Sequence, residues 1–171
     1  MALLSACTPS LNWRDLALAG GARVMLPCKP ERLERALPLA GRSVMASLQV
    51  CDADGSSWSA MAYELPDAAQ RDEALREARR LLAANLGAPA AEELPMPRLQ
   101  GLATTSEARR LRLQGQRPGG GPVQVEALFT AQDRWVFQLV VMAPAGTASP
   151  RSQAAVEEFL GSLRGSAGSP S

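Results

Sequence analysis

The residues best suited to chemistry in this chain are three cysteines, Cys7, Cys28 and Cys51, and the chain contains no histidine. A cysteine can carry a covalent group, form a disulfide, act as a nucleophile or bind a metal. Without histidine there is no imidazole base for a catalytic triad and no imidazole ligand for zinc or haem. The spacing and surroundings of the cysteines therefore decide which chemistry is available.

Cys7 ends a short segment of apolar and small residues. Leu4-Ser5-Ala6-Cys7 resembles the lipobox of bacterial lipoprotein precursors. The resemblance implies that diacylglycerol is attached to the Cys7 sulfur and that Cys7 becomes the mature N-terminus. We interpret residues 1–6 as the remnant of a longer signal peptide. Thr8 rather than Asp follows the cysteine, which by the sorting pattern of lipoproteins implies the outer membrane.

Cys28 and Cys51 each lie at the end of an apolar run that is typical of a strand. Neighbouring strands could bring the two thiols together, and export would place them in an oxidising compartment. We therefore predict a Cys28–Cys51 disulfide, which on the chain-entropy estimate stabilises the fold by about 3 kcal/mol. The alternative is two unrelated buried thiols that act as small apolar fillers.

The length and composition predict one globular domain. The 171 residues carry a net charge of +1, with 46% hydrophobic and 20% charged side chains. This balance gives no reason to expect nucleic acid as a partner, and no apolar run is long enough to cross a bilayer. We expect lipidated Cys7 and a tether over 7–21, a single α+β domain over 22–164, and a disordered tail over 165–171.

In the first half of the chain, apolar and polar residues alternate as they do in strands, and a helical pattern follows. Strands are predicted over 22–26, 32–39, 44–50 and 58–63, and the turn at 52–55 makes the last two a hairpin. Strand 44–50 has one polar side, so we expect one of its faces to lie in solvent. Asp67 is predicted to cap a helix that ends at Gly87, with Gln70 as its capping-box partner.

The second half repeats this organisation. Residues 88–101 are expected to form an irregular crossover before strands over 105–116, 123–129 and 135–142. The last of these is apolar on both faces and so is predicted to be central. A final helix begins at Ser149 and Pro150. Its core stripe is formed by Val156, Phe159, Leu160 and Leu163.

Three motifs that could indicate a binding function are better explained as structural features such as turns and strand residues. Asp52 to Gly55 begins like a calcium loop but has no Glu at the twelfth position. Glycines 119–121 are typical of a hairpin loop, since no phosphate-binding helix start follows. Arg110 and Arg112 share one strand face while Arg109 lies on the other, so they form no single basic patch. No metal, cofactor or nucleic acid is predicted.

The order of strands, helix, strands, helix is similar to that of the PsbP-like fold over residues 22–164. This resemblance implies a central antiparallel sheet of about six strands in two β-meanders, covered by two main helices. It implies no catalytic residues for this chain.

These observations favour a non-catalytic, membrane-anchored periplasmic lipoprotein that acts as a protein-interaction or support module in the cell envelope. Its partners would be the outer membrane, through the lipid, and another envelope protein. One alternative is a small-ligand binder with a pocket between sheet and helix, walled by Trp58, Tyr63 or Trp135. A further alternative is an enzyme of unrecognised type, which would have to work without histidine.

Overall fold

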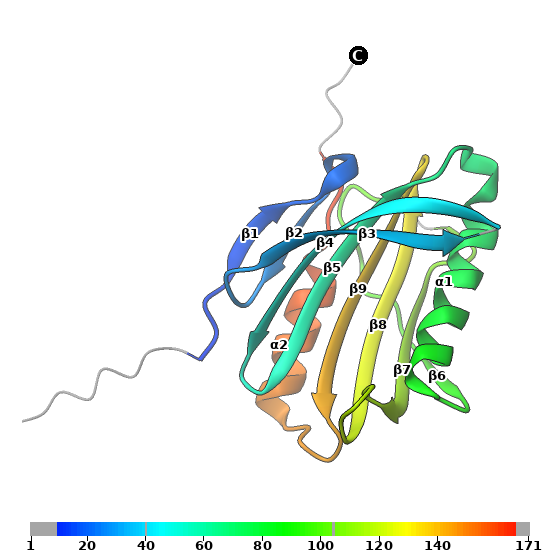
Figure 1. Ribbon diagram of the computed structural model, residues 1–171. Coiled ribbons are helices and arrows are strands. Elements are labelled where there is room, and N and C mark those ends of the chain that lie inside the picture. The colour runs from blue at the N-terminus through cyan, green and yellow to red at the C-terminus, as the bar shows by residue number, and fades with distance from the viewer. Residues whose placement is uncertain (1–9, 40, 104, 167–171) are drawn as a thin grey trace, which may run out of the picture.

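A computed structural model describes residues 10–39, 41–103 and 105–166. Its main element is a seven-stranded antiparallel sheet in the order β3-β4-β5-β9-β8-β7-β6, and β1 and β2 form a separate hairpin (Figure 1). The α+β class is confirmed, with seven strands in the main sheet where about six were predicted. The strands are β1 (Arg14–Ala17), β2 (Arg23–Leu26), β3 (Glu31–Leu39), β4 (Arg42–Ala53), β5 (Ser56–Glu64), β6 (Ala91–Leu94), β7 (Arg109–Gln116), β8 (Pro122–Gln132) and β9 (Trp135–Pro144).

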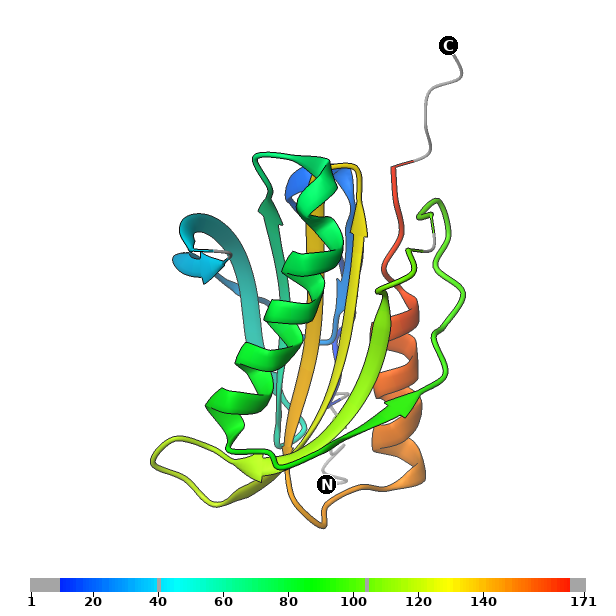
Figure 2. The ribbon, with the colours of Figure 1, turned by 90° about the vertical axis from the view of Figure 1, so that its right-hand side faces the viewer.

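Both faces of the sheet are covered, but by different elements (Figures 1 and 2). Helix α1 (Arg71–Leu86) packs on one face, here called the α1 face. Helix α2 (Pro150–Gly161) and the β1–β2 hairpin pack on the other, the α2 face. Strand β9 is buried on both sides, with Val136 toward α1 and Phe137 toward α2. The predicted central position of residues 135–142 is confirmed.

The hairpin turns follow from local sequence. Asp54 and Gly55, between β4 and β5, both have positive φ, at 51° and 75°. Two such residues in a row are the mark of a turn whose twist matches that of the flanking strands, and Asp-Gly is a preferred pair for it. Asp133 has a φ of 53° in the turn between β8 and β9. The hairpin predicted around residues 52–55 is confirmed, and so is the hairpin loop predicted at glycines 119–121, which joins β7 and β8.

Helix α1 begins close to its predicted start. The Asp67 side chain accepts a hydrogen bond from the Ala69 N–H at 2.9 Å and so caps a 3₁₀ turn, Ala68–Gln70, that leads into α1. The Gln70 N–H donates to the Asp67 carbonyl, so the first turn is tighter than the predicted capping box. The helix ends at Gly87, which adopts the left-handed conformation expected of a helix terminator.

Helix α2 is fixed by its cap and by its apolar stripe. Ser149 and Ser152 form a reciprocal capping box, with Pro150 in the first turn. Of the predicted stripe, Phe159 and Leu160 are fully buried, as is Leu163 just beyond the helix, whereas Val156 is partly buried against the same core. The helix therefore closes the core of the α2 face.

A buried ion cluster also holds α2 against the sheet. Arg110 on β7 bonds Glu126 on β8 at 2.8 Å and reaches Glu157 on α2 with both terminal nitrogens. Arg112, on the same face of β7 as predicted, bonds Glu126 at 2.9 Å. Arg110 and Glu126 are both almost fully buried. Buried charges need partners of opposite sign, and here each charge has one.

The tether predicted over 7–21 is wrong for residues 14–21. Residues 14–17 form β1, which pairs with β2, and Leu18 enters the core of the α2 face. Trp13 contacts Trp58 edge to face with ring centroids 6.3 Å apart. Four-residue β1 is too short to show a clear alternation, so only its packing reveals it. Cys7 and residues 167–171 of the expected tail lie outside the described residues.

The β1–β2 hairpin is joined to the other end of the domain. Arg23 and Arg164 exchange two backbone hydrogen bonds, of 2.9 and 3.0 Å. The Met25 N–H donates to the Ser162 hydroxyl at 2.9 Å. Asp15 pairs with both arginines. These contacts fix the position of the hairpin beside the end of α2.

Two further expectations are corrected by contacts between distant segments. Gln49 was expected in solvent but is 4% exposed, because the β1–β2 hairpin covers it and Gln49 donates to the Ala17 carbonyl at 2.8 Å. The crossover expected over 88–101 contains β6, which pairs with the edge of β7. The sequence of β6, Ala-Glu-Glu-Leu, has no strand alternation. The hydrogen bonds to β7 therefore stabilise this strand, although its own sequence does not indicate one.

Candidate functional site

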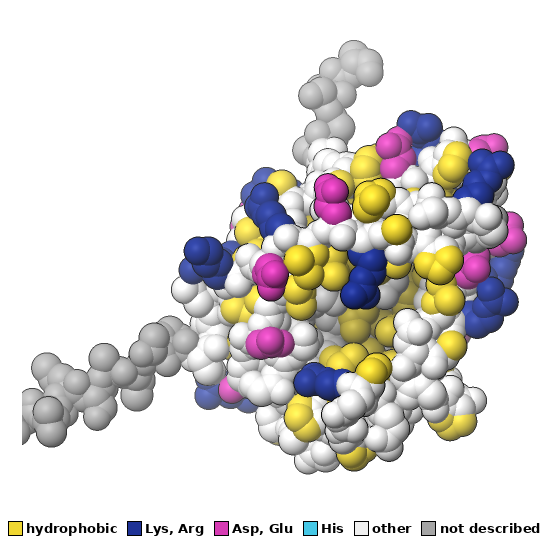
Figure 3. Space-filling view, in the orientation of Figure 1, with side chains coloured by type: hydrophobic (Ala, Val, Ile, Leu, Met, Phe, Trp, Pro, Cys, Tyr) yellow, Lys and Arg dark blue, Asp and Glu magenta, His cyan; other side chains and the backbone are white. Residues whose placement is uncertain are grey.

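A groove opens on the α1 face between α1 and the outer strands β3 and β4. It has a volume of about 540 Å³, within the range of small-ligand sites. We call it the apolar groove, and Figure 3 shows this side of the molecule, with a hollow lined by hydrophobic side chains. Its floor and walls include Leu37, Leu48, Met61, Leu81, Leu82 and Met142.

The position of α1 explains why the groove exists. The helix packs mainly on β7 and β8, and its buried residues contact Leu113, Val125 and their neighbours. Gly115 lets the end of the helix approach closely, since a Cβ there would lie 2.5 Å from the Leu86 carbonyl oxygen. With α1 on that side, the same face of β4, β5 and β9 lacks a full cover. Apolar side chains that would otherwise be core remain partly open.

A row of residues crosses the sheet within the groove. The strand register places Arg35 opposite Ala46, Ala46 opposite Tyr63, and Tyr63 opposite Val136. Directly paired residues in an antiparallel sheet project from the same face. Arg35 and Tyr63 therefore flank the small side chain of Ala46, and both contribute to the lining of the groove.

The Tyr63 hydroxyl is a buried polar group without a partner. Tyr63 is 1% exposed, and its hydroxyl has no hydrogen bond within the described residues. Burial raises the pKa of Tyr63, and the negative charge of Glu77 on α1 raises it further. The phenol thus stays protonated and able to donate at neutral pH. An unsatisfied buried group of this kind costs about 1–3 kcal/mol.

Arg35 brings a positive charge to the same lining. It projects from edge strand β3, where it is exposed, and no ion pair to it is found within the described part of the chain. It is the one charged residue among the described residues that line the groove. The groove thus combines a largely apolar lining with a row that contains the donors Arg35 and Tyr63, and its other polar lining residues are Ser59, Asn85 and Gln138.

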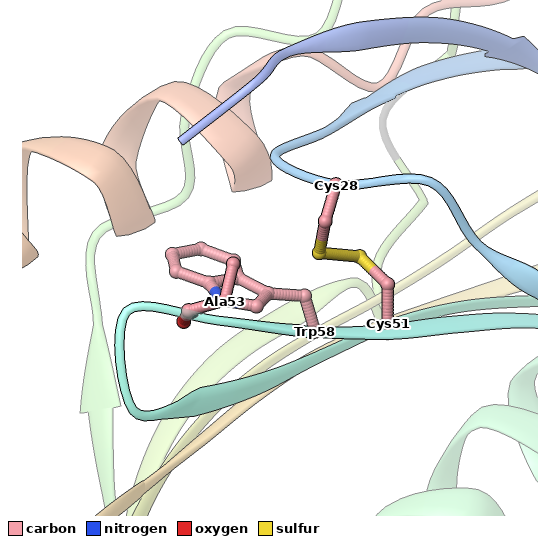
Figure 4. The surroundings of a disulfide bond; sticks show 4 residues. All are labelled: Cys28, Cys51, Ala53 and Trp58. Carbon is pink, nitrogen blue, oxygen red and sulfur yellow. Dashed lines mark hydrogen bonds between the residues drawn. A yellow bond between two sulfur atoms is a disulfide. The ribbon is translucent and has the colours of Figure 1, made fainter. Parts of the chain in front are cut away.

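The predicted disulfide is present on the opposite side of the sheet. Cys28, between β2 and β3, is bonded to Cys51 on β4 with their Cα atoms 5.9 Å apart. Figure 4 shows the bridge beside Trp58, whose indole N–H donates to the Ala53 carbonyl at 3.1 Å. Cys51 and Trp58 belong to the α2 face. The disulfide therefore secures the covering hairpin and takes no part in the groove.

The three aromatic residues expected as pocket walls are separated by the fold. Tyr63 lines the apolar groove. Trp58 lines a second hollow of about 360 Å³ between the sheet and the start of α2, which also includes Glu126 and Ser149. Trp135 lines a small hollow of about 80 Å³ near Gly20. A pocket between sheet and helix with an aromatic wall is thus found twice, and the larger one contains Tyr63.

Sequence reasoning missed Arg35 as a residue of the groove lining and did not locate the groove. Leu48 and Met61 follow the same alternation as true core residues, so their partial exposure has no signature in the local pattern. The position of Arg35 among leucines at 33, 37 and 39 was a usable signal, because it places a charge on an otherwise apolar strand face.

Within the described residues, neither helix is long and apolar enough to span a bilayer. Cys7, the predicted lipid attachment site, lies outside these residues, so its surroundings are not part of the site described above. The groove, the disulfide and the predicted anchor are therefore three separate features of the chain.

Comparisons with known proteins bear on the fold alone. No family model and no curated protein matches the chain. A crystal structure of a protein from Bacteroides thetaiotaomicron is similar, with a TM-score of 0.50 and 12% identity over 88% of this chain; the match spans 47% of that protein. A protein of unknown function from Pseudomonas aeruginosa has a TM-score of 0.40 and 16% identity, over 94% of this chain and 99% of that one. The chain shares its fold with the first of these.

Proposed function

We propose that this protein is a non-catalytic lipoprotein of the bacterial cell envelope that binds an apolar ligand in the groove beside α1. The observation that carries the proposal is the apolar groove itself, a volume of about 540 Å³ on a sheet face that α1 leaves partly uncovered. The lining supplies hydrophobic contacts and a few hydrogen-bonding groups, which suits binding.

The proposed location is the periplasmic face of the outer membrane, with diacylglycerol on Cys7 as the anchor. The lipobox-like segment Leu4-Ser5-Ala6-Cys7 supports the anchor. The Cys28–Cys51 disulfide supports an oxidising compartment, because such bonds persist mainly in exported proteins. The sheet covered by two helices also supports the finer assignment to the PsbP-like fold.

The described N-terminal residues suit such an anchor. Ser10 accepts a hydrogen bond from Arg151 on α2 at 2.8 Å, so the chain enters the domain on the α2 face. The groove lies on the α1 face, on the other side of the sheet. An anchor attached before residue 10 would leave the groove free to receive a ligand.

A second candidate is an interaction with another envelope protein through β3. This strand is an edge of the sheet, and most of its nine residues are exposed. A free edge can pair with a strand from a partner. Its charged residues oppose unspecific pairing, so the partner strand would need complementary charges.

The neutral apolar dye N-phenyl-1-naphthylamine tests the binding function in the full chain. We expect saturable fluorescence enhancement that Met61→Gln weakens, because the change places a polar amide on the groove floor. Met45→Gln is the matched control, since Met45 is 61% exposed on β4 and lies outside the groove. Equal binding by the two variants would count against the groove as the site.

The anchor is tested separately by radioactive palmitate labelling of the full chain, expressed behind a lipoprotein signal peptide in a bacterial host. Label on the wild-type protein and none on Cys7→Ser is expected. Cys28→Ser with Cys51→Ser serves as the control, because it removes the two disulfide cysteines and leaves the proposed attachment site unchanged. Label that persists on Cys7→Ser would refute lipidation at this residue.

A further inference from the structure

The apolar groove contains a polar row as well as a largely apolar floor. Arg35 and Tyr63 lie in one cross-strand row with Ala46 between them. Two inter-strand spacings separate their Cα atoms by about 10 Å. The guanidinium and the phenol are both hydrogen-bond donors, and the small Ala46 side chain leaves space between them. The guanidinium cannot accept a hydrogen bond, so a ligand group beside Arg35 is best an acceptor.

The positive charge of Arg35 favours an anion as the ligand group that accepts these hydrogen bonds. Arg35 is the one charged residue among the described groove residues, so no carboxylate there neutralises it. Tyr63 is 1% exposed, and its buried hydroxyl lacks a hydrogen-bond partner within the described part of the chain. A ligand oxygen that approaches this side chain could supply that partner. A carboxylate has two oxygens and could accept from both residues.

The floor continues from this row along the strands. From Tyr63 it passes Met61, which is paired with Gln138, and Ser59, which is paired with Val140. It ends at the row of Ser57, where Met142 lies opposite on β9. Six strand residues separate the two ends, a length of about 20 Å. Leu48 forms one side of this path, and Leu81 and Leu82 of α1 form the other. An extended, unbranched apolar chain matches this shape.

From these observations we infer that the groove binds a long-chain fatty acid, with its carboxylate between Arg35 and Tyr63 and its acyl chain along the Leu48–Met61–Met142 floor. The inference rests on the proposed function and adds the chemical class of the ligand. The fatty acid satisfies the Tyr63 hydroxyl, pairs with the Arg35 guanidinium and covers the apolar side chains that α1 leaves open.

The test compares the fluorescent fatty acid cis-parinaric acid with its methyl ester, which has the same chain and no charge. We expect the full chain to bind the acid about tenfold more tightly, a factor that corresponds to about 1.4 kcal/mol. Arg35→Gln should remove this preference and leave binding of the ester unchanged. Tyr63→Phe should reduce it, because the variant keeps the ring and loses the donor.

Arg32→Gln is the matched control, because Arg32 is an exposed arginine on the same strand that pairs with Gln49 and so projects from the opposite face. It should keep the full preference for the acid. Equal affinity of the wild type for acid and ester would overturn the fatty-acid inference and leave the apolar groove standing as a binding site. Failure of both probes and of the neutral dye would instead refute the proposed function. A melting temperature like that of the wild type shows that each variant is folded.

Discussion

Cys51 on β4 and Trp58 on β5 are directly paired in the strand register, so the disulfide to Cys28 lies beside the indole that supports the N-terminal hairpin. Trp58 contacts Trp13 on one side and Phe159 of α2 on another, each in an edge-to-face arrangement. The covalent bridge and the aromatic contacts thus reinforce the same part of the α2 face.

Loss of the disulfide should destabilise the protein without removing its fold. Cys28→Ala with Cys51→Ala is expected to lower the free energy of unfolding by about 3 kcal/mol, because the unfolded chain is no longer restricted by the loop. Urea denaturation followed by tryptophan fluorescence measures the change. The reducing agent alone should produce the same shift in the wild type and none in the double variant. An unchanged midpoint would show that the bridge adds nothing to stability.

Arg110 should be one of the residues most sensitive to substitution. Arg110→Ala leaves Glu126 with less compensation in a buried site, and removal of one partner of a buried pair costs about 3–5 kcal/mol. Arg109→Ala is the control, since Arg109 pairs at 3.3 Å with the exposed Glu93. That change should cost less than about 1 kcal/mol. Chemical denaturation of both variants compares them, and equal losses would contradict a special role for the cluster.

Acid should weaken the attachment of α2. Hydrogen bonds from Arg110 hold the pKa of Glu157 below its ordinary value of 4.5. A carboxyl whose pKa is lower in the folded state stabilises the fold above its unfolded pKa. This contribution is lost as the pH falls through the lower folded pKa.

Unfolding free energies measured from pH 7 to pH 3 should therefore decline below about pH 4.5. Glu157→Gln should flatten part of that decline, whereas Glu34→Gln on exposed β3 should leave it as in the wild type. A decline of equal steepness in all three proteins would exclude Glu157 as a contributor.

Gly115 should tolerate no side chain. Gly115→Ala places a methyl group against the backbone of Leu86, so α1 or β7 must shift, at a cost of about 1–3 kcal/mol. Gly121→Ala is the control, because a Cβ there meets nothing within 4 Å and its φ is not positive. Thermal unfolding compares the two. The same melting temperature for both variants would show that the end of α1 can shift without a measurable loss of stability.

The elements with strong local signals could be predicted from the sequence. Asp67 with Gly87, Ser149 with Pro150, and the Asp54-Gly55 turn act through their own backbone neighbours, so a single chain segment is enough to identify them. The disulfide was predictable because both cysteines stand near the ends of apolar runs.

The remaining features depend on contacts between distant segments. Residues 14–17 form a strand only because β2 pairs with them, and Gln49 is buried only because that hairpin covers it. The partner of Arg110 on α2 is 47 residues away. The groove is the feature hardest to predict from the sequence. It depends on how much of the sheet α1 covers, and no residue of the groove floor indicates where that cover ends.

The contacts of Arg23 and Met25 with Arg164 and Ser162 have a consequence for biosynthesis. The first hairpin of the domain packs against residues that are made last among those described. The contacts of the hairpin with β4 and β5 can form early, but those with residues 162–164 can form only when nearly the whole described domain has been synthesised. The core of the α2 face is therefore completed late in folding, and until then the N-terminal hairpin stays partly exposed to chaperones and proteases.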